Sequence, residues 1–174
     1  MGQSDTGPVT RFLTEDHRRL ETLLQSALLS GGHVDQVVYD QFRAGLLRHI
    51  GMEEKILLPT AQRLRGGEPL SLAARLRLDH GAIAALLMPT PTAGLIASLR
   101  TILDRHNTIE EGPEGLYETC DTLAAPESGQ LLLTLRAAPA VSVLPHADTP
   151  AVLGAVRRAL ERAGYESLGH WPLV

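Results

Sequence analysis

Four long segments of the chain repeat apolar residues at intervals of three and four, and Gly or Pro residues separate them. The spacing predicts amphipathic helices over Val9–Leu29, from Asp35 to Pro59 and the Gly66-Gly67 pair, from Pro69 to Pro89, and over Thr92–Gly112. Four such helices joined by short connections are typical of an up-down-up-down four-helix bundle. The composition agrees, because 31 Leu outnumber 9 Val and only 3% of residues are aromatic, which favours helices over sheets. We therefore expect an all-α fold.

Residues 1–124, which end with a further helical stretch over Leu116–Leu123, are interpreted as the bundle domain. Residues 125–174 differ in pattern and are expected to form an appendage packed on the bundle. Within them, Pro126–Ala138 favours a short helix, residues 139–148 favour extended chain, and Thr149-Pro150 is typical of the start of a helix reaching about Gly164. The alternation over residues 131–136 and 141–144 also permits a small β-hairpin.

Charge and cysteine content exclude several classes of protein. A net charge of −4 without a long basic run speaks against nucleic acid as a partner. Cys120 is the single cysteine, is expected to be a buried thiol, and cannot form an internal disulfide. Because the first ten residues also lack a secretory pattern, we expect a reduced, cytoplasmic compartment. No apolar run approaches the roughly 20 residues of a membrane span. The oligomeric state stays open.

Two short motifs occur twice, in the same order. Asp16-His17 precedes His49-Ile-Gly-Met-Glu53-Glu54, and Asp79-His80 precedes His106-Asn-Thr-Ile-Glu110-Glu111. Each half of the bundle thus supplies one His from its first helix and a His-x-x-x-Glu from its second. Positions i and i+4 lie about 40° apart around a helix, whereas i+5 lies about 140° away. Glu53 and Glu110 should therefore share a face with the His four residues before them, and the Glu that follows each should point elsewhere.

The face in question is the apolar one. His49 and Glu53 interrupt a stripe that also contains Phe42, Leu46 and Leu57, and the other three His interrupt the remaining stripes. A lone His of this kind is more often a hydrogen-bonded core residue, and a single His-x-x-x-Glu is most often a surface pair. Burying two unpaired carboxylates costs several kcal/mol, however, and divalent cations would offset that cost. The predicted metal ligands are His17, His49, Glu53, His80, His106 and Glu110.

The remaining polar residues of the motifs are not expected to bind metal. Asp16, Glu54, Asp79 and Glu111 are expected to be solvated or to contact the ligands from outside. The other three histidines, His33, His146 and His170, repeat no pattern and are expected in solvent.

Four imidazoles and two carboxylates suit two metal ions, each taking two His and sharing both Glu as bridges. Iron fits best and manganese second, whereas zinc prefers closed sites with fewer ligands and no His-Glu-x-x-His occurs. The Glu-x-x-His spacing of ferritin-like proteins is absent, because Arg77 and Leu103 stand three residues before His80 and His106. Each ion would keep an open position for a small ligand.

On these motifs the sequence resembles the hemerythrin-like HHE cation-binding proteins, over about Thr10 to Leu123. The resemblance implies a non-haem di-iron centre, bridged by oxo or hydroxo and by two carboxylates, that meets dioxygen, nitric oxide or peroxide. It also implies the same six ligands. Two features depart from the family: the oxygen carriers have a fifth His where this chain has Ala84, and Gly112-Pro113 follows the second Glu pair directly, which leaves open whether Pro113 displaces Glu110.

The expected function is the binding of dioxygen or nitric oxide for sensing, scavenging or storage. One alternative is a di-iron enzyme or iron donor in nitrosative or oxidative stress, which reduces peroxide or nitric oxide or repairs iron-sulfur clusters. It would need an electron donor, and Tyr117 is the one evident proton donor besides the ligands. A further alternative is a structural helical module in which the His cluster is incidental.

Overall fold

Every regular element that the computed structural model describes, over residues 6–165, is a helix. The only β-type pairing in this range is an isolated bridge between Leu28 and Val34, at the turn after the first helix. The expected all-α fold is confirmed. The alternative of a β-hairpin is wrong, because its first segment lies on a helix whose Leu131 and Leu135, one turn apart, are both buried.

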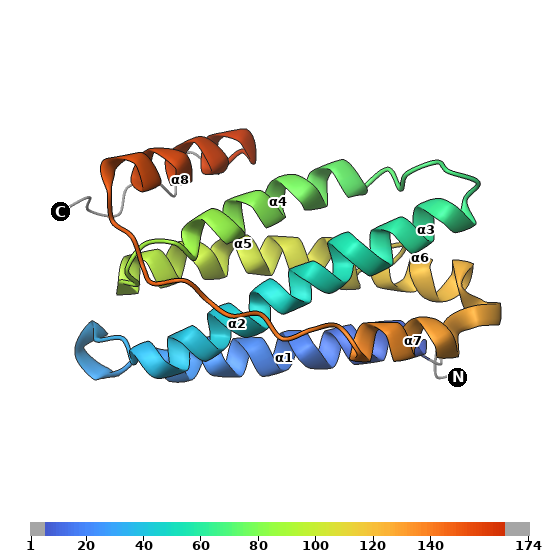
Figure 1. The fold of residues 1–174 in the computed structure, drawn as a ribbon, viewed down its shortest axis with the longest axis horizontal. Helices are drawn as coiled ribbons and strands as arrows, with labels where there is room; N and C mark the ends of the chain where they lie inside the picture. The colour runs from blue at the N-terminus through green and yellow to red at the C-terminus, as the bar shows by residue number, and fades with distance from the viewer. Residues whose placement is uncertain (1–5, 166–174) are drawn as a thin grey trace.

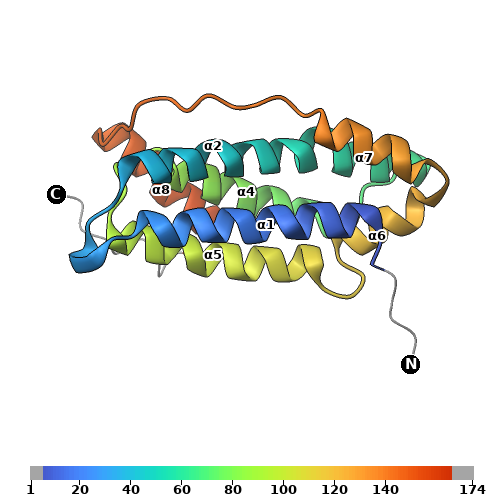
Figure 2. The same cartoon turned by 90° about the horizontal axis from the view of Figure 1, so that it is seen from below.

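Four long helices lie side by side: α1 (Pro8–Ala27), α2 (Gln36–Met52), α4 (Ala73–Leu86) and α5 (Ala93–Glu111), as Figures 1 and 2 show. Two of them begin at residues whose side chains satisfy free backbone N–H groups. Asp35 accepts hydrogen bonds from Val37 and Val38, and Thr92 accepts one from Leu95. The helix starts therefore follow directly from the capping residues in the sequence.

The second helix does not stop at Pro59. After α2 the chain forms a π-helical turn (Glu53–Leu57) and continues as α3 (Leu58–Leu64). The N–H of Leu58 donates to the carbonyl of Glu53, five residues back, which widens the helix by one residue. Pro59 then falls in the first turn of α3, where a missing N–H is tolerated. The helix ends at Leu64, before two glycines with positive φ.

Four shorter helical elements follow the long ones: α6 (Leu116–Leu123), the 3-10 turn η3 (Ala125–Glu127), α7 (Ser128–Arg136) and α8 (Pro150–Arg162). Helix α7 packs on α1, and α8 packs on α4. Between α7 and α8 an extended segment, residues 137–149, runs along α2 (Figure 2). Arg43 and Arg48 of α2 donate to its carbonyls at Leu144 and Ala138. We refer to this segment, residues 137–149, as the strap.

The apolar core is divided into two clusters by a layer of buried polar residues. One cluster contains Leu20, Leu46 and Ile83, and the other contains Leu13, Met52 and Leu76. Each interrupted stripe thus passes from one cluster through a polar residue into the other. Cys120 is buried in the second cluster, as expected. Within residues 6–165, no helix has the length and hydropathy needed to cross a membrane.

Candidate metal centre

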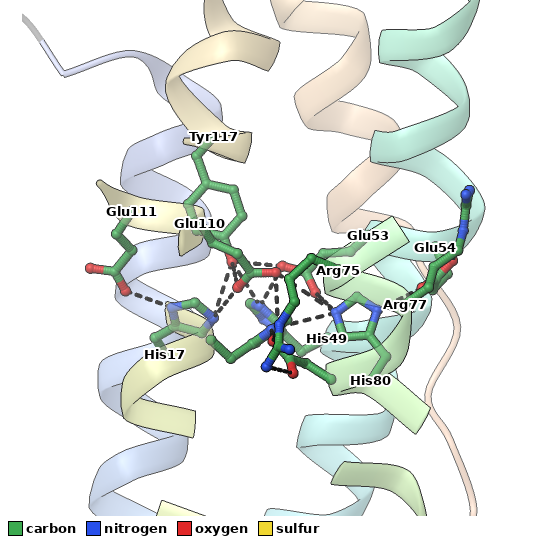
Figure 3. A network of polar contacts seen from close by, with 12 residues as sticks. His17, His49, Glu53, Glu54, Arg75, Arg77, His80, Glu110, Glu111 and Tyr117 are labelled. Atoms are coloured by element: carbon green, nitrogen blue, oxygen red, sulfur yellow. Dashed lines mark hydrogen bonds and ion pairs between the residues drawn. The ribbon is translucent and has the colours of Figure 1, made fainter. Parts of the chain in front are cut away.

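The structure brings the six predicted residues together between the four long helices, and Figure 3 shows five of them, all but His106, at one level. None is more than 8% exposed, and both carboxylates are fully buried. They form two overlapping groups, in each of which four ligand atoms lie within 4.8 Å of one another. The groups are His17, His49, Glu53 and Glu110, and Glu53, His80, His106 and Glu110. Both carboxylates belong to both groups.

Each shared carboxylate reaches the two groups with different oxygens. Oε1 of Glu53 lies 3.1 Å from Nε2 of His49, and Oε2 lies 3.1 Å from Nε2 of His80. Glu110 repeats the arrangement, with Oε2 3.4 Å from Nε2 of His17 and Oε1 2.9 Å from Nε2 of His106. This is the disposition of two carboxylates that bridge two adjacent positions.

The outer nitrogen of each imidazole faces a further carboxylate. Nδ1 lies 2.6 Å from Glu111 in His17 and 2.6 Å from Glu54 in His80. The corresponding distances are 2.8 Å from His49 to Asp16 and 3.6 Å from His106 to Asp79. A proton on Nδ1 is donated outwards, so the lone pair of Nε2 points into the centre. The four acidic residues that the sequence left outside the predicted ligand set thus face the predicted ligands.

The negative charge of the cluster controls its protonation. Burial alone would lower the pKa of His49, but the charges of Glu53 and the hydrogen bond to Asp16 raise it to about 10. The same opposition raises the pKa of His80 to about 11 and that of His106 to about 9. Burial would raise the pKa of Glu53, but the imidazoles of His49 and His80 hold it well below its usual range. The centre therefore attracts cations strongly.

Protons alone fit this centre poorly. Nε2 of His80 faces Nε2 of His106 at 3.1 Å, and at most one proton fits between two such nitrogens. Oε2 of Glu53 and Oε1 of Glu110 are buried and accept no hydrogen bond of normal geometry, although each faces an imidazole Nε2, at 3.1 Å and 2.9 Å. Lone pairs that converge in this way suit divalent cations with imidazole and carboxylate ligands. Each of the two groups of described residues therefore fits a metal ion.

The turn after α5 leaves Glu110 in place. The sequence left open whether Pro113 displaces this residue; in the structure α5 remains helical to Glu111, and Glu110 is fully buried among the other predicted ligands. Gly112 follows as the C-cap, so Pro113 lies outside the helix, where it cannot remove a helical hydrogen bond.

Tyr117 of α6 also belongs to the centre, although the sequence indicated it only as a nearby proton donor. Its hydroxyl donates to Oε1 of Glu53 at 2.6 Å, and Figure 3 shows the ring reaching the cluster from above. Burial and the charges of Glu110 and Glu53 raise its pKa well above 10. Helical spacing from Glu110 cannot place Tyr117, because the chain turns between the two residues. The Gly-Pro-x-Gly sequence of that turn was the available signal.

The three remaining histidines lie outside the centre or outside the described residues. His33 is exposed, as expected. The expectation that His146 is in solvent is wrong. This residue belongs to the strap, which lies along α2, and its ring stacks on that of Tyr39 with the centroids 6.0 Å apart. Its side chain is therefore only 15% exposed. His170 falls outside the described residues. Ala84 provides no fifth imidazole, and each of the two groups contains only the two histidines predicted for it.

The chain matches a known protein family. Residues 9–118, more than half of the chain, match the family described as hemerythrin HHE cation binding domain. The matched range begins in α1 and ends just after Tyr117. Neither the curated proteins nor the solved structures gave a significant match to this chain.

Proposed function

The chain belongs to the hemerythrin HHE cation-binding domain family, and on this basis we propose that it is a di-iron protein that binds dioxygen or nitric oxide. The two iron ions would lie in the two groups of ligand atoms, with Glu53 and Glu110 as bridges. We also propose that α1, α2, α4 and α5 form the up-down-up-down bundle of this family, within a domain of residues 1–124, and that residues 125–174 are an appendage.

The observation that carries the proposal is the sharing of both carboxylates between two groups of buried imidazoles. The donor set supports iron, because imidazole with carboxylate and no thiolate suits non-haem iron with open positions better than closed zinc sites. Manganese, which accepts similar ligands, is the next candidate. The shared carboxylates support two ions rather than one.

The chain's own residues perform three tasks in this function. The imidazoles of His17, His49 and His80 present Nε2 to the centre because their outer nitrogens lie within hydrogen-bond distance of Glu111, Asp16 and Glu54. Asp79 lies 3.6 Å from the outer nitrogen of His106. Glu53 and Glu110 hold the two positions next to each other. The apolar clusters on both sides of the polar layer exclude water. Bound iron would supply the redox-active centre at which a diatomic molecule binds.

Spectroscopy of the iron-loaded protein tests this proposal. Protein produced with iron should contain two iron ions per chain by elemental analysis. After anaerobic reduction, stopped-flow mixing with dioxygen, and separately with nitric oxide, should give an absorption change that persists and reverses when the gas is removed. Protein without metal, and of unchanged stability when treated with chelator, would contradict the proposal and leave a structural module.

A second candidate function is that of an iron donor or a di-iron enzyme of oxidative or nitrosative stress. A surface cleft of about 610 Å³ lies between the start of α1 and α6, and Glu111, Glu118 and Asp121 are among its lining residues. Glu111 also contacts His17, so the cleft connects a ligand with an acidic surface that favours cation exchange. Transfer of iron to a chelator faster than adduct formation, or turnover of peroxide with a reductant, would favour this function.

A further inference from the structure

Tyr117 contacts one of the two groups of ligand atoms at four points. Its hydroxyl oxygen lies 2.6 Å from Glu53 Oε1 and 3.0 Å from Glu110 Oε2. The same oxygen lies 3.0 Å from Nε2 of His17 and 3.1 Å from Nε2 of His49. These four atoms come from the four residues of the first group. The side chain is fully buried, so water does not compete for the hydroxyl.

A single hydroxyl proton cannot satisfy these four neighbours. Both carboxylate oxygens accept hydrogen bonds, and both Nε2 atoms do so as well when Nδ1 carries the proton. With the imidazoles neutral, as metal binding requires, a hydrogen-bonding role would leave most of these contacts between acceptors. The distances have another explanation, since ligand atoms at right angles around a metal, with bonds of about 2.1 Å, lie about 3 Å apart. The phenolic oxygen is positioned as a fifth donor to one ion.

The turn between α5 and α6 brings Tyr117 to the His17–His49 group. Between α5 and α6 the chain reverses in four residues, and Glu114 adopts a positive φ of 57°. A Cβ on Gly115 would lie 2.6 Å from the carbonyl oxygens of Glu110 and Ile109, so the close approach requires glycine. Seven residues after Glu53, at the position equivalent to Tyr117, the first half has Thr60 on α3. The His80–His106 group has no equivalent tyrosine.

We propose that Tyr117 is a fifth protein ligand to the metal ion of the His17–His49 group. The inference rests on the proposed di-metal function and goes beyond it, because it makes the two positions unequal. On coordination the phenol exchanges its O–H bond for an O–metal bond, the proton leaves to solvent, and no electron is transferred. An ion held by His80 and His106 would have fewer protein ligands, and that position would be the one open to the diatomic molecule.

The visible spectrum of the ferric protein tests this inference, since phenolate bound to Fe(III) gives a charge-transfer band. The band should be present in the wild-type protein and in Tyr39→Phe, a matched control that removes a buried tyrosine outside the ligand groups. It should be absent from Tyr117→Phe at unchanged iron content. Resonance Raman excitation within the band should enhance phenolate ring modes.

The outcomes separate this inference from the function on which it rests. Two iron ions without the band, or an unchanged band in Tyr117→Phe, would overturn the ligand assignment and leave the di-iron site intact. A wild-type chain that takes up no iron would overturn both. Should Tyr117→Phe fail to fold, the double variant Tyr39→Phe/Tyr165→Phe decides, because Tyr117 is then the one remaining tyrosine of three. Loss of the band in that variant would overturn the inference.

Discussion

Glu54 lies 2.6 Å from Nδ1 of His80, although the two residues are 26 positions apart and belong to different halves of the sequence repeat. Glu111 makes the reciprocal contact with His17, whereas Asp16 and Asp79 face imidazoles of their own halves. The two halves are therefore connected through the second Glu of each pair, and each half orients a predicted ligand of the other.

Replacing Glu54 with Ala should weaken metal binding without removing a ligand. Loss of the carboxylate frees the His80 ring and lowers its basicity, and such partners are typically worth about 10- to 100-fold in metal affinity. Competition with a chelator measures the affinity, and two ions should still bind at saturation. Glu15→Ala, an exposed carboxylate on α1, is the control. Equal affinities for the two variants would contradict the role of Glu54.

Ligand variants should separate the two metal positions. His80→Ala should lower the iron content to about one ion per chain, because this residue belongs to one group, whereas Glu53→Ala should lower it further, because this carboxylate belongs to both. His33→Ala, an exposed histidine outside both groups, should retain both ions. Elemental analysis of the purified variants measures the content. Equal losses in all three would contradict the ligand assignment.

Much of the fold and the site follows from local sequence. The caps Asp35 and Thr92 and the glycine pairs determine where helices start and end, and these depend on residues a few positions apart. The i, i+4 spacing also placed Glu53 beside His49, as the structure has it. Stripe periodicity, a purely local property, was thus sufficient to assemble the six-residue set.

The features that the sequence did not predict depend on distant residues or on changes of register. The angle of about 140° from His49 correctly turned Glu54 away from the first imidazole, but it could not identify His80 as its partner. The π-helical turn that admits Pro59 changes the hydrogen-bond register without a distinct local pattern. Tyr117 reaches the centre through a reversal of the chain, which no helical spacing describes.

The pH dependence of the metal-free protein should follow its imidazoles. The pKa values of His49, His80 and His106 are raised from 6.5 to about 10, 11 and 9. Protonation is therefore tighter in the folded state, and its contribution is fully present below about pH 6.5 and lost as the pH rises through 9 to 11. Urea unfolding of chelator-treated protein should show this loss. A free energy of unfolding that stays constant between about pH 6 and about pH 10 would contradict this dependence, because the pH then rises from below the unfolded pKa into the range of the folded pKa values.

Metal should reverse that dependence. Imidazoles bind metal only when neutral at Nε2, so metal must displace the tightly held protons and its apparent affinity should rise with pH. Stability of the iron-loaded protein should consequently fall as the pH is lowered, while that of the metal-free protein should not. Proton release on metal addition, measured in weakly buffered solution with an indicator dye, provides an independent check.

The strap should depend on Arg43. This side chain is 4% exposed and donates to the carbonyls of Leu87 and Leu144. Arg43→Met keeps the apolar stem but removes the charged donors, and we expect a loss of about 2–4 kcal/mol in the free energy of unfolding. Arg157→Met, an exposed change on α8, should stay within about 0.5 kcal/mol. Iron content should be unchanged in both, since neither residue belongs to the ligand groups.

The turn between α5 and α6 should not tolerate a side chain at Gly115. Its φ of −69° is open to any residue, so the restriction is steric: a Cβ would meet three carbonyl oxygens at 2.6–2.7 Å. Gly115→Ala should therefore cost about 1–3 kcal/mol in the free energy of unfolding, through forced backbone shifts. Gly81→Ala, inside α4 with no atom within 4 Å of the added Cβ, should instead stabilise the protein by about 0.5–1 kcal/mol. Thermal unfolding of both variants measures the contrast. Two shifts of the same sign would show that the turn can relax, and that Gly115 is not what holds α6 against the centre.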